Sequence, residues 1–312
     1  DRREAEGDLN DRGAKFDSDL CLENIFNVFS GDAEPSYFSL RELDAMKKEN
    51  FPHGNKSIAT QGQYASIMRY MEKNFRMKSP ISMEENELLR ILEDTLIYVP
   101  SSTNTEEHAD ISLYDHMKMT GATAAVLMKY MKTLGITDYK GFCFTHNKEN
   151  RNKGVFLMIS GDFSGIQKFI YHIRSEGAMR MLRGRSFYLD IALENIVDEL
   201  LNALHLSRAN LIYCSGGHFY ILADNTKETQ DAVKDVAKKI NQGLVKLFSG
   251  TLYLAIGCEP LCANDLMAES DTVHHKKNIF RSVSEKVSMA KLSRYGPDIL
   301  TELFDENSNV NR

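Results

Sequence analysis

Two glycine-bearing segments are the places in this chain where the backbone can come close to a ligand. The first is Gly-Asp-Phe-Ser-Gly at 161–165, which follows the apolar run 155–160, and the second is Ser-Gly-Gly at 215–217. Glycine has no Cβ, so the main chain at both segments can approach a phosphate group. A Gly-Gly hairpin is most often only a tight turn, and this alternative stays open beside ligand contact.

Asp162 is the one acidic residue within the two segments. In palm-type nucleotidyltransferases, two such segments meet on one sheet surface, and catalysis needs carboxylates from both, because two magnesium ions must hold the attacking hydroxyl, the triphosphate and the leaving group in line. The second segment runs directly into His218 without an acid, and one isolated carboxylate is a poor cage for magnesium. We therefore expect nucleotide binding without catalysis from these residues alone. Asp162 and Ser164 are equally suited to cap the helix that follows them.

Basic residues are concentrated between the two segments, in a chain that is otherwise acidic. Within 168–185 they are opposed by the single acid Glu176. The basic residues are Lys168, Arg174, Arg180, Arg183 and Arg185. Such a density of positive charge beside a phosphate site predicts contact with a triphosphate or with nucleic acid. A solvated helix face explains the same charges equally well.

His116 and its neighbour Asp115 lie near the start of a strong helical pattern at 113–134. The pair is compatible with a metal site of the HD phosphohydrolase kind. A lone histidine beside an aspartate is more often a hydrogen-bonded structural pair, so both interpretations remain.

The pattern of apolar residues predicts the elements that must position these groups. Helices are expected within 39–98 and at 113–134, before the pattern changes after Gly135. The following elements are then strands at 155–160, 210–214, 218–223 and 251–256, with helices at 166–174, 186–204 and 226–248. This order is that of a ferredoxin-like domain, with an antiparallel sheet and helices on one side. The predicted fold class is therefore α+β, with a helical N-terminal part followed by this domain.

Composition excludes several classes of protein. The chain has 312 residues, of which 42% are hydrophobic, which is enough for two domains with separate cores. Its formal net charge of -6 argues against indiscriminate nucleic-acid binding over the whole surface. No apolar run is long enough to cross a bilayer, so we expect a soluble, cytoplasmic protein without membrane contact. Five scattered cysteines favour a reducing compartment over a disulfide framework.

Several longer segments resemble one protein family. SGDFSGIQKFIYHI, GAMRMLRGRSFYLDIALENI and NLIYCSGGHFYIL are similar to the first palm domain, a GGDEF- or cyclase-like fold, of the large subunit of type III-A CRISPR effector complexes. ISLYDHMKMTGATAA is similar to the helix that closes the permuted HD domain of that family, and the opening DRRE resembles another part of it. SEKVSMAKLSRYGPDI resembles the link that leaves the first palm.

The resemblance implies a domain organisation. Residues 1–138 would be a partial permuted HD-type domain and linker, 139–282 the first palm, and 283–312 a link toward a zinc and second palm region that this sequence lacks. The family's second palm carries the Gly-Gly-Asp-Asp hairpin with the metal-binding acids. The resemblance therefore implies that this chain alone is inactive.

The resemblance also implies a function in antiviral defence. The intact family protein joins ATP into cyclic oligoadenylate with Mg²⁺ or Mn²⁺, and its HD domain cuts single-stranded DNA with a divalent metal such as Mn²⁺ or Ni²⁺. Its partners would be the other subunits of the complex, guide RNA, target RNA and single-stranded DNA. The nucleotide-binding residues would be Asp162, Ser164, Gly165, Ser215, Gly216 and Gly217, and His116 would be a metal ligand. The alternative is a non-catalytic nucleotide-sensing or scaffold module.

Overall fold

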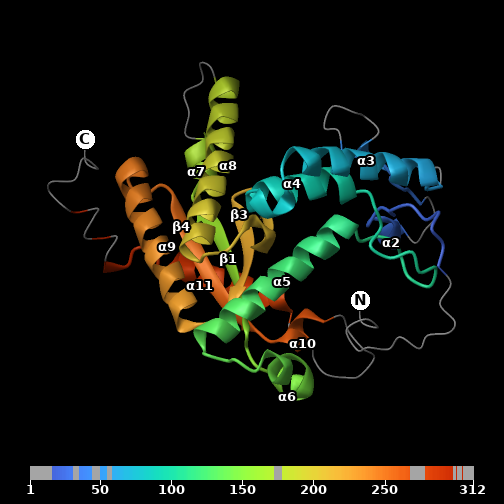
Figure 1. Ribbon diagram of the computed structural model, residues 1–312. Coiled ribbons are helices and arrows are strands. Elements are labelled where there is room, and N and C mark those ends of the chain that lie inside the picture. The colour runs from blue at the N-terminus through green and yellow to red at the C-terminus, as the bar shows by residue number, and fades with distance from the viewer. Residues whose placement is uncertain are drawn as a thin grey trace. The chain divides into compact units, whose positions relative to one another are not determined.

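The computed structural model describes residues 16–30, 35–43, 50–54, 58–171, 178–267, 278–297, 300 and 304. The chain forms two compact units, 1–121 and 122–312, and Figure 1 shows their elements. The predicted domain limits at 138/139 and 282/283 stay a prediction. None of the described helices is both long enough and apolar enough to span a membrane.

The N-terminal unit is helical. It contains α2 (Asn27–Ser30), α3 (Gln61–Met77), the short turn η2 (Pro80–Ser82), α4 (Glu85–Leu96) and the beginning of α5 (Leu113–Thr133). A capping box starts α3, because the Thr60 side chain accepts from the Gln63 amide while the Gln63 side chain accepts from the Thr60 amide. The buried core of this unit is formed by Cys21, Leu40, Ala59, Ile67, Leu96, Val99 and Tyr114.

The C-terminal unit is built around a four-stranded antiparallel sheet in the order β2-β3-β1-β4. The strands are β1 (Phe156–Ser164), β2 (Leu211–Ser215), β3 (His218–Asp224) and β4 (Tyr253–Leu261). Helices α7 (Ile166–Tyr171) and α8 (Ala178–Ala203) lie between β1 and β2 in the chain, and α9 (Lys227–Phe248) lies between β3 and β4. This strand order and these connections are those of the ferredoxin-like fold, so the predicted α+β class is confirmed.

Shorter elements complete the C-terminal unit. They are η3 (Gly141–Thr145), α6 (Asn147–Asn150), η4 (Arg208–Asn210), α10 (Ala263–Leu266) and α11 (Ile279–Leu292). The segment that the sequence assigns to a link after 282 thus contains most of a helix.

Several element boundaries differ from those that the sequence predicts; the last strand, for example, is expected at 251–256, whereas β4 spans Tyr253–Leu261. The first strand is expected to end at 160, but β1 continues to Ser164 because its last residues pair with β4, with Ser164 opposite Tyr253. The Gly-Asp-Phe-Ser segment is therefore strand and not turn. Helix α8 begins at Ala178 and not at 186, since the added residues are mostly strong helix formers such as Ala, Met, Leu and Arg.

Helices cover both faces of the sheet, so the prediction of helices on one side only is wrong. On one face, side chains such as Leu157 and Phe219 pack with α8 and α9 in the main core. Helix α11 lies against the other face and buries Val283 and Val287 there. A Cβ at Gly257 would lie 2.5 Å from the Val287 nitrogen, so glycine is what lets α11 come this close to β4.

A buried ion pair holds the C-terminal half of α5 to this unit. The carboxylate of Asp224, at the end of β3, is fully buried and lies 2.8 Å from the Lys129 ammonium. The hydroxyls of Thr226 and Thr229 donate to the same carboxylate at 2.6 and 2.8 Å. Burial alone would raise the pKa of Asp224, but the hydrogen bonds and the lysine outweigh burial and hold that pKa below its ordinary value. Lys129 also donates to the Leu204 carbonyl at 2.7 Å.

We expect Lys129→Met to lower the free energy of unfolding by about 3 kcal/mol, because the variant leaves the Asp224 carboxylate buried without its counter-charge. Denaturant unfolding of the full chain measures this change. The control is Lys132→Met, which removes an exposed lysine from the last turn of the same helix and should alter stability by less than about 0.5 kcal/mol. Equal stability of the two variants would contradict the prediction.

Candidate nucleotide site at one end of the sheet

The pairing of β1 with β3 brings the two glycine-bearing segments together. Asp162 lies opposite His218, and Gly161 lies opposite Phe219. The Phe163 amide donates to the Gly217 carbonyl at 2.9 Å, so the first segment contacts the turn between β2 and β3 directly. All six residues expected to bind nucleotide therefore lie on β1, just after it, or at this turn.

Several glycines of these segments are needed by the packing of the protein itself. A Cβ at Gly161 would lie 2.2 Å from the Phe219 ring, and one at Gly217 would lie 2.4 Å from the Ile166 side chain. A Cβ at Gly165 would lie 2.0 Å from the Thr251 carbonyl oxygen. Protein atoms therefore already occupy the space beside each of these three glycines that a ligand would need.

Gly216 is different, because a Cβ there would meet no atom within 4 Å. Gly216 and the preceding Ser215 are both exposed. The positive φ of Gly216, 63°, also favours glycine for the turn alone. Ser215 and Gly216 are thus the part of the turn that is open to a ligand.

The carboxylate of Asp162 forms an ion pair with Lys291 in the last turn of α11. Both side chains are partly exposed, Asp162 at 26% and Lys291 at 36%. Asp162 therefore does not cap α7, which was one of the two interpretations of the sequence. Ser164 is the last residue of β1 and is half-buried.

His218 lies beside this ion pair on the same face of the sheet. Its Nε2 is 3.2 Å from the Ser160 hydroxyl oxygen, and its ring meets the Tyr220 ring edge to face at 4.6 Å between centroids. Burial lowers the pKa of His218 below its ordinary value, Asp162 opposes this shift, and the Lys291 charge adds to it. Tyr220 in turn contacts Phe280 of α11, with the ring centroids 5.1 Å apart.

The sequence analysis missed Ser160, Tyr220, Phe280 and Lys291 as neighbours of the site. The first two could have been found, because alternate residues of a strand face the same side and both share a face with Asp162 or His218. No sequence pattern places Phe280 and Lys291 there, since both depend on where α11 docks.

The described residues of the predicted basic patch lie on α7 and α8, and a role for them in binding stays a prediction. Lys168 on α7 and Arg180 and Arg183 on α8 are exposed, and Figure 1 shows this part of α8 extending away from the sheet. Arg185 donates to the Phe169 carbonyl and lies over the Phe169 ring, 5.3 Å from its centroid, so it joins α8 to α7. Arg174 and Glu176 lie outside the described residues.

His116 is half-buried on α5 in the N-terminal unit. Its neighbour Asp115 takes part in a local cap, in which the Ser112 hydroxyl donates to the Asp115 carboxylate at 2.8 Å and accepts from the Asp115 amide at 3.0 Å. Among the residues that the structure describes, no three His, Cys, Asp or Glu side chains are grouped to hold a metal ion. The opening DRRE lies outside those residues, and a metal-binding role of His116 stays a prediction.

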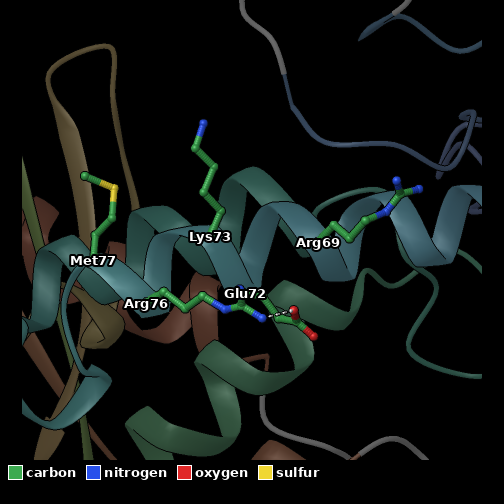
Figure 2. Close-up of a pocket in the computed structure, with 5 residues that line it drawn as sticks. All are labelled: Arg69, Glu72, Lys73, Arg76 and Met77. Atoms are coloured by element: carbon green, nitrogen blue, oxygen red, sulfur yellow. Dashed lines mark hydrogen bonds and ion pairs between the residues drawn. The ribbon is translucent and has the colours of Figure 1, made fainter.

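Two hollows elsewhere contain none of the expected site residues. The larger, of about 510 Å³, lies along α3 in the N-terminal unit and is lined by Arg69, Glu72, Lys73, Arg76 and Met77. Figure 2 shows Lys73 pointing away from the Glu72–Arg76 ion pair, which measures 3.4 Å. The smaller, of about 190 Å³, lies in the C-terminal unit beside α6.

Comparison with known proteins gives consistent results. Residues 155–306 match the family described as Csm1 subunit domain B. The chain is 37% identical to the CRISPR system single-strand-specific deoxyribonuclease Cas10/Csm1 (subtype III-A) of Mycobacterium tuberculosis strain H37Rv, over 97% of this chain and 38% of that relative. It spans less than half the length of such relatives.

The structure is similar to crystal structures of a Csm1-Csm4 cassette. The cassette in complex with pppApApA has a TM-score of 0.73 and 31% identity, covering 93% of this chain and 37% of the matched chain. The cassette in complex with one ATP has a TM-score of 0.73 and 30% identity, covering 95% of this chain and 37% of the matched chain.

We expect the stability of the chain to fall as the pH is lowered through about 6.5, partly because of His218. A histidine whose pKa is lowered by folding binds more protons when unfolded, so its contribution is present above the unfolded pKa and is lost below it. Melting temperatures measured between about pH 7.5 and 5.5 should therefore fall less for His218→Asn than for the wild type.

The control for this pH series is His205→Asn, which changes an exposed histidine in the loop after α8. It should keep the pH dependence of the wild type. The role of His218 would be wrong if both variants showed the same dependence.

Proposed function

Because this chain belongs to the Csm1 family of type III-A CRISPR proteins, we propose that its C-terminal unit binds ATP where β1 meets the turn between β2 and β3. The observation that carries this proposal is the pairing of Asp162 with His218, which places the two glycine-bearing segments side by side. Structures of related proteins in complex with ATP or pppApApA support the choice of ligand.

The residues of this site divide into two groups under the proposal. Ser215 and Gly216 are open to solvent and would contact the nucleotide directly, through a hydroxyl and the main chain. Gly165 and Gly217 are filled on their Cβ side by protein atoms and would act by shaping the backbone. Asp162 and Ser164 lie next to them at the end of β1.

The residues at this end of the sheet do not fit a metal centre by themselves. Asp162 is the single carboxylate of the two segments, and Lys291 already neutralises it. Mg²⁺ is held by several oxygen ligands in near-octahedral geometry, which one paired carboxylate does not supply. We propose that this palm holds a substrate for cyclic oligoadenylate synthesis, while the acids that bind Mg²⁺ or Mn²⁺ come from a second palm.

For the intact protein we propose the activities of its relatives. A relative is named a single-strand-specific deoxyribonuclease, so the HD part would cut single-stranded DNA with a divalent metal such as Mn²⁺ or Ni²⁺. The Csm1-Csm4 structures support assembly with other subunits of a type III complex. Guide RNA and target RNA would be bound by that assembly, in cytoplasmic antiviral defence.

A non-catalytic role is the second candidate function. The ion pair that neutralises Asp162 suits a module that binds nucleotide without turning it over, or a scaffold. A scaffold would not bind nucleotide, whereas a palm that holds substrate and a module that senses nucleotide would both bind it.

We expect ATP with Mg²⁺ to raise the melting temperature of the chain, because a ligand of the folded state stabilises it by about 2.7 kcal/mol at a hundredfold excess over its Kd. Ser215→Trp should abolish this shift by filling the open side of the turn. The matched control is Asn202→Trp, which adds the same side chain at an exposed position near the end of α8 and should keep the shift. A wild-type chain that ATP does not protect at millimolar concentration would favour the scaffold role.

We expect the chain alone to make no oligoadenylate from ATP with Mg²⁺ or Mn²⁺, since its site lacks the carboxylates that phosphoryl transfer needs. Anion-exchange chromatography with mass spectrometry of the reaction measures this. Product formation that Asp162→Asn abolishes would show that the single acid suffices, and the proposed division between two palms would then be wrong.

A further inference from the structure

Helix α11 is fixed to the sheet by contacts that do not involve Lys291. The Tyr253 hydroxyl donates to the Ala290 carbonyl at 3.4 Å, and Arg294 donates to the Thr251 carbonyl at 2.9 Å. Gly257 admits the helix backbone directly, and Val283 and Val287 are buried. Helix α11 thus has several contacts with the sheet besides the ion pair between Lys291 and Asp162.

The same ion pair is only partly shielded from water. The side chains of Lys291 and Asp162 are 36% and 26% exposed. Pairs with this exposure contribute about 0–1 kcal/mol, because solvent screens the charges and the side chains lose conformational freedom. Lys291 could therefore leave Asp162 for a more highly charged group at little cost in free energy.

Lys291 has the charge that binds a phosphate, and it lies next to the candidate site. Its ammonium forms an ion pair with Asp162. Asp162 lies opposite His218, the first residue of β3 after the Ser215–Gly217 turn. A lysine ammonium is a compact, mobile charge that binds phosphate well. Arg294, the next cation on the chain, is held by the carbonyl oxygens of Gly250 and Thr251.

We propose that Lys291 binds the triphosphate of the nucleotide, and that Asp162 holds the ammonium in position until the nucleotide arrives. Asp162 is then a positioning residue and not a metal ligand. This inference rests on the proposed ATP site, and it assigns the part of the nucleotide that α11 recognises.

The test compares ATP with adenosine, because only ATP carries the phosphates. In the full chain, Lys291→Met should weaken ATP binding by about tenfold or more, the loss typical of a hydrogen bond to a charged group, while adenosine binding changes less than about twofold. Isothermal titration calorimetry with each ligand, with and without Mg²⁺, gives both values. Asp162→Asn should keep or improve ATP binding, since the competing carboxylate is neutralised.

The matched control is Lys286→Met, which removes an exposed lysine from the preceding turns of the same helix and should leave both affinities unchanged. An equal loss of ATP and adenosine binding in Lys291→Met would overturn the inference, because it would show a structural role only. Unchanged ATP binding in that variant would also overturn it. If the wild type binds neither ligand, the proposed ATP site fails and this inference fails with it, whereas wild-type ATP binding keeps the site whatever Lys291 does.

Discussion

The arrangement of the site depends on the register of β1 between its two neighbours. Asp162 is opposite His218 on one side and Ala255 on the other, and this alignment fixes which side chains share a face. A slip of one residue would turn Asp162 into the apolar core that Leu157 and Phe219 occupy. The burial of that core under α8 and α9 therefore positions the polar residues on the opposite face.

Helix α11 completes the site from the face of the sheet that carries Asp162 and His218. Its approach needs the missing side chain at Gly257, and it brings Phe280 to Tyr220 and Lys291 to Asp162. The position of Lys291 beside Asp162 thus depends on Gly257, because Gly257 lets α11 pack closely on β4.

The sequence was enough to predict the ferredoxin-like order of strands and helices along the chain, because the apolar pattern marks each of these elements. It was not enough to predict that β1 extends through Gly-Asp-Phe-Ser, since these residues have low strand propensity and only pairing with β4 makes them strand. Glycines gave an ambiguous signal: Gly161 and Gly217 are needed for close packing, whereas Gly216 faces open space. The two situations look alike in sequence. Lys291 could not be found because its place depends on the docking of a helix far along the chain.

The charge balance at the end of the sheet is compatible with the proposal that a palm with a single acid holds ATP. A free carboxylate at Asp162 would repel a triphosphate, and in a partly buried setting the repulsion of unit charges 4 Å apart is about 4 kcal/mol. Lys291 cancels that charge, so the ion pair is neutral overall before the nucleotide arrives, and under the proposal its ammonium adds an attractive contact to the phosphates. A palm that binds catalytic metals needs the reverse, an excess of acids that repels phosphate until the ions are bound. The lone, compensated Asp162 therefore suits a site that holds substrate, and the same compensation makes it a poor site for a metal ion.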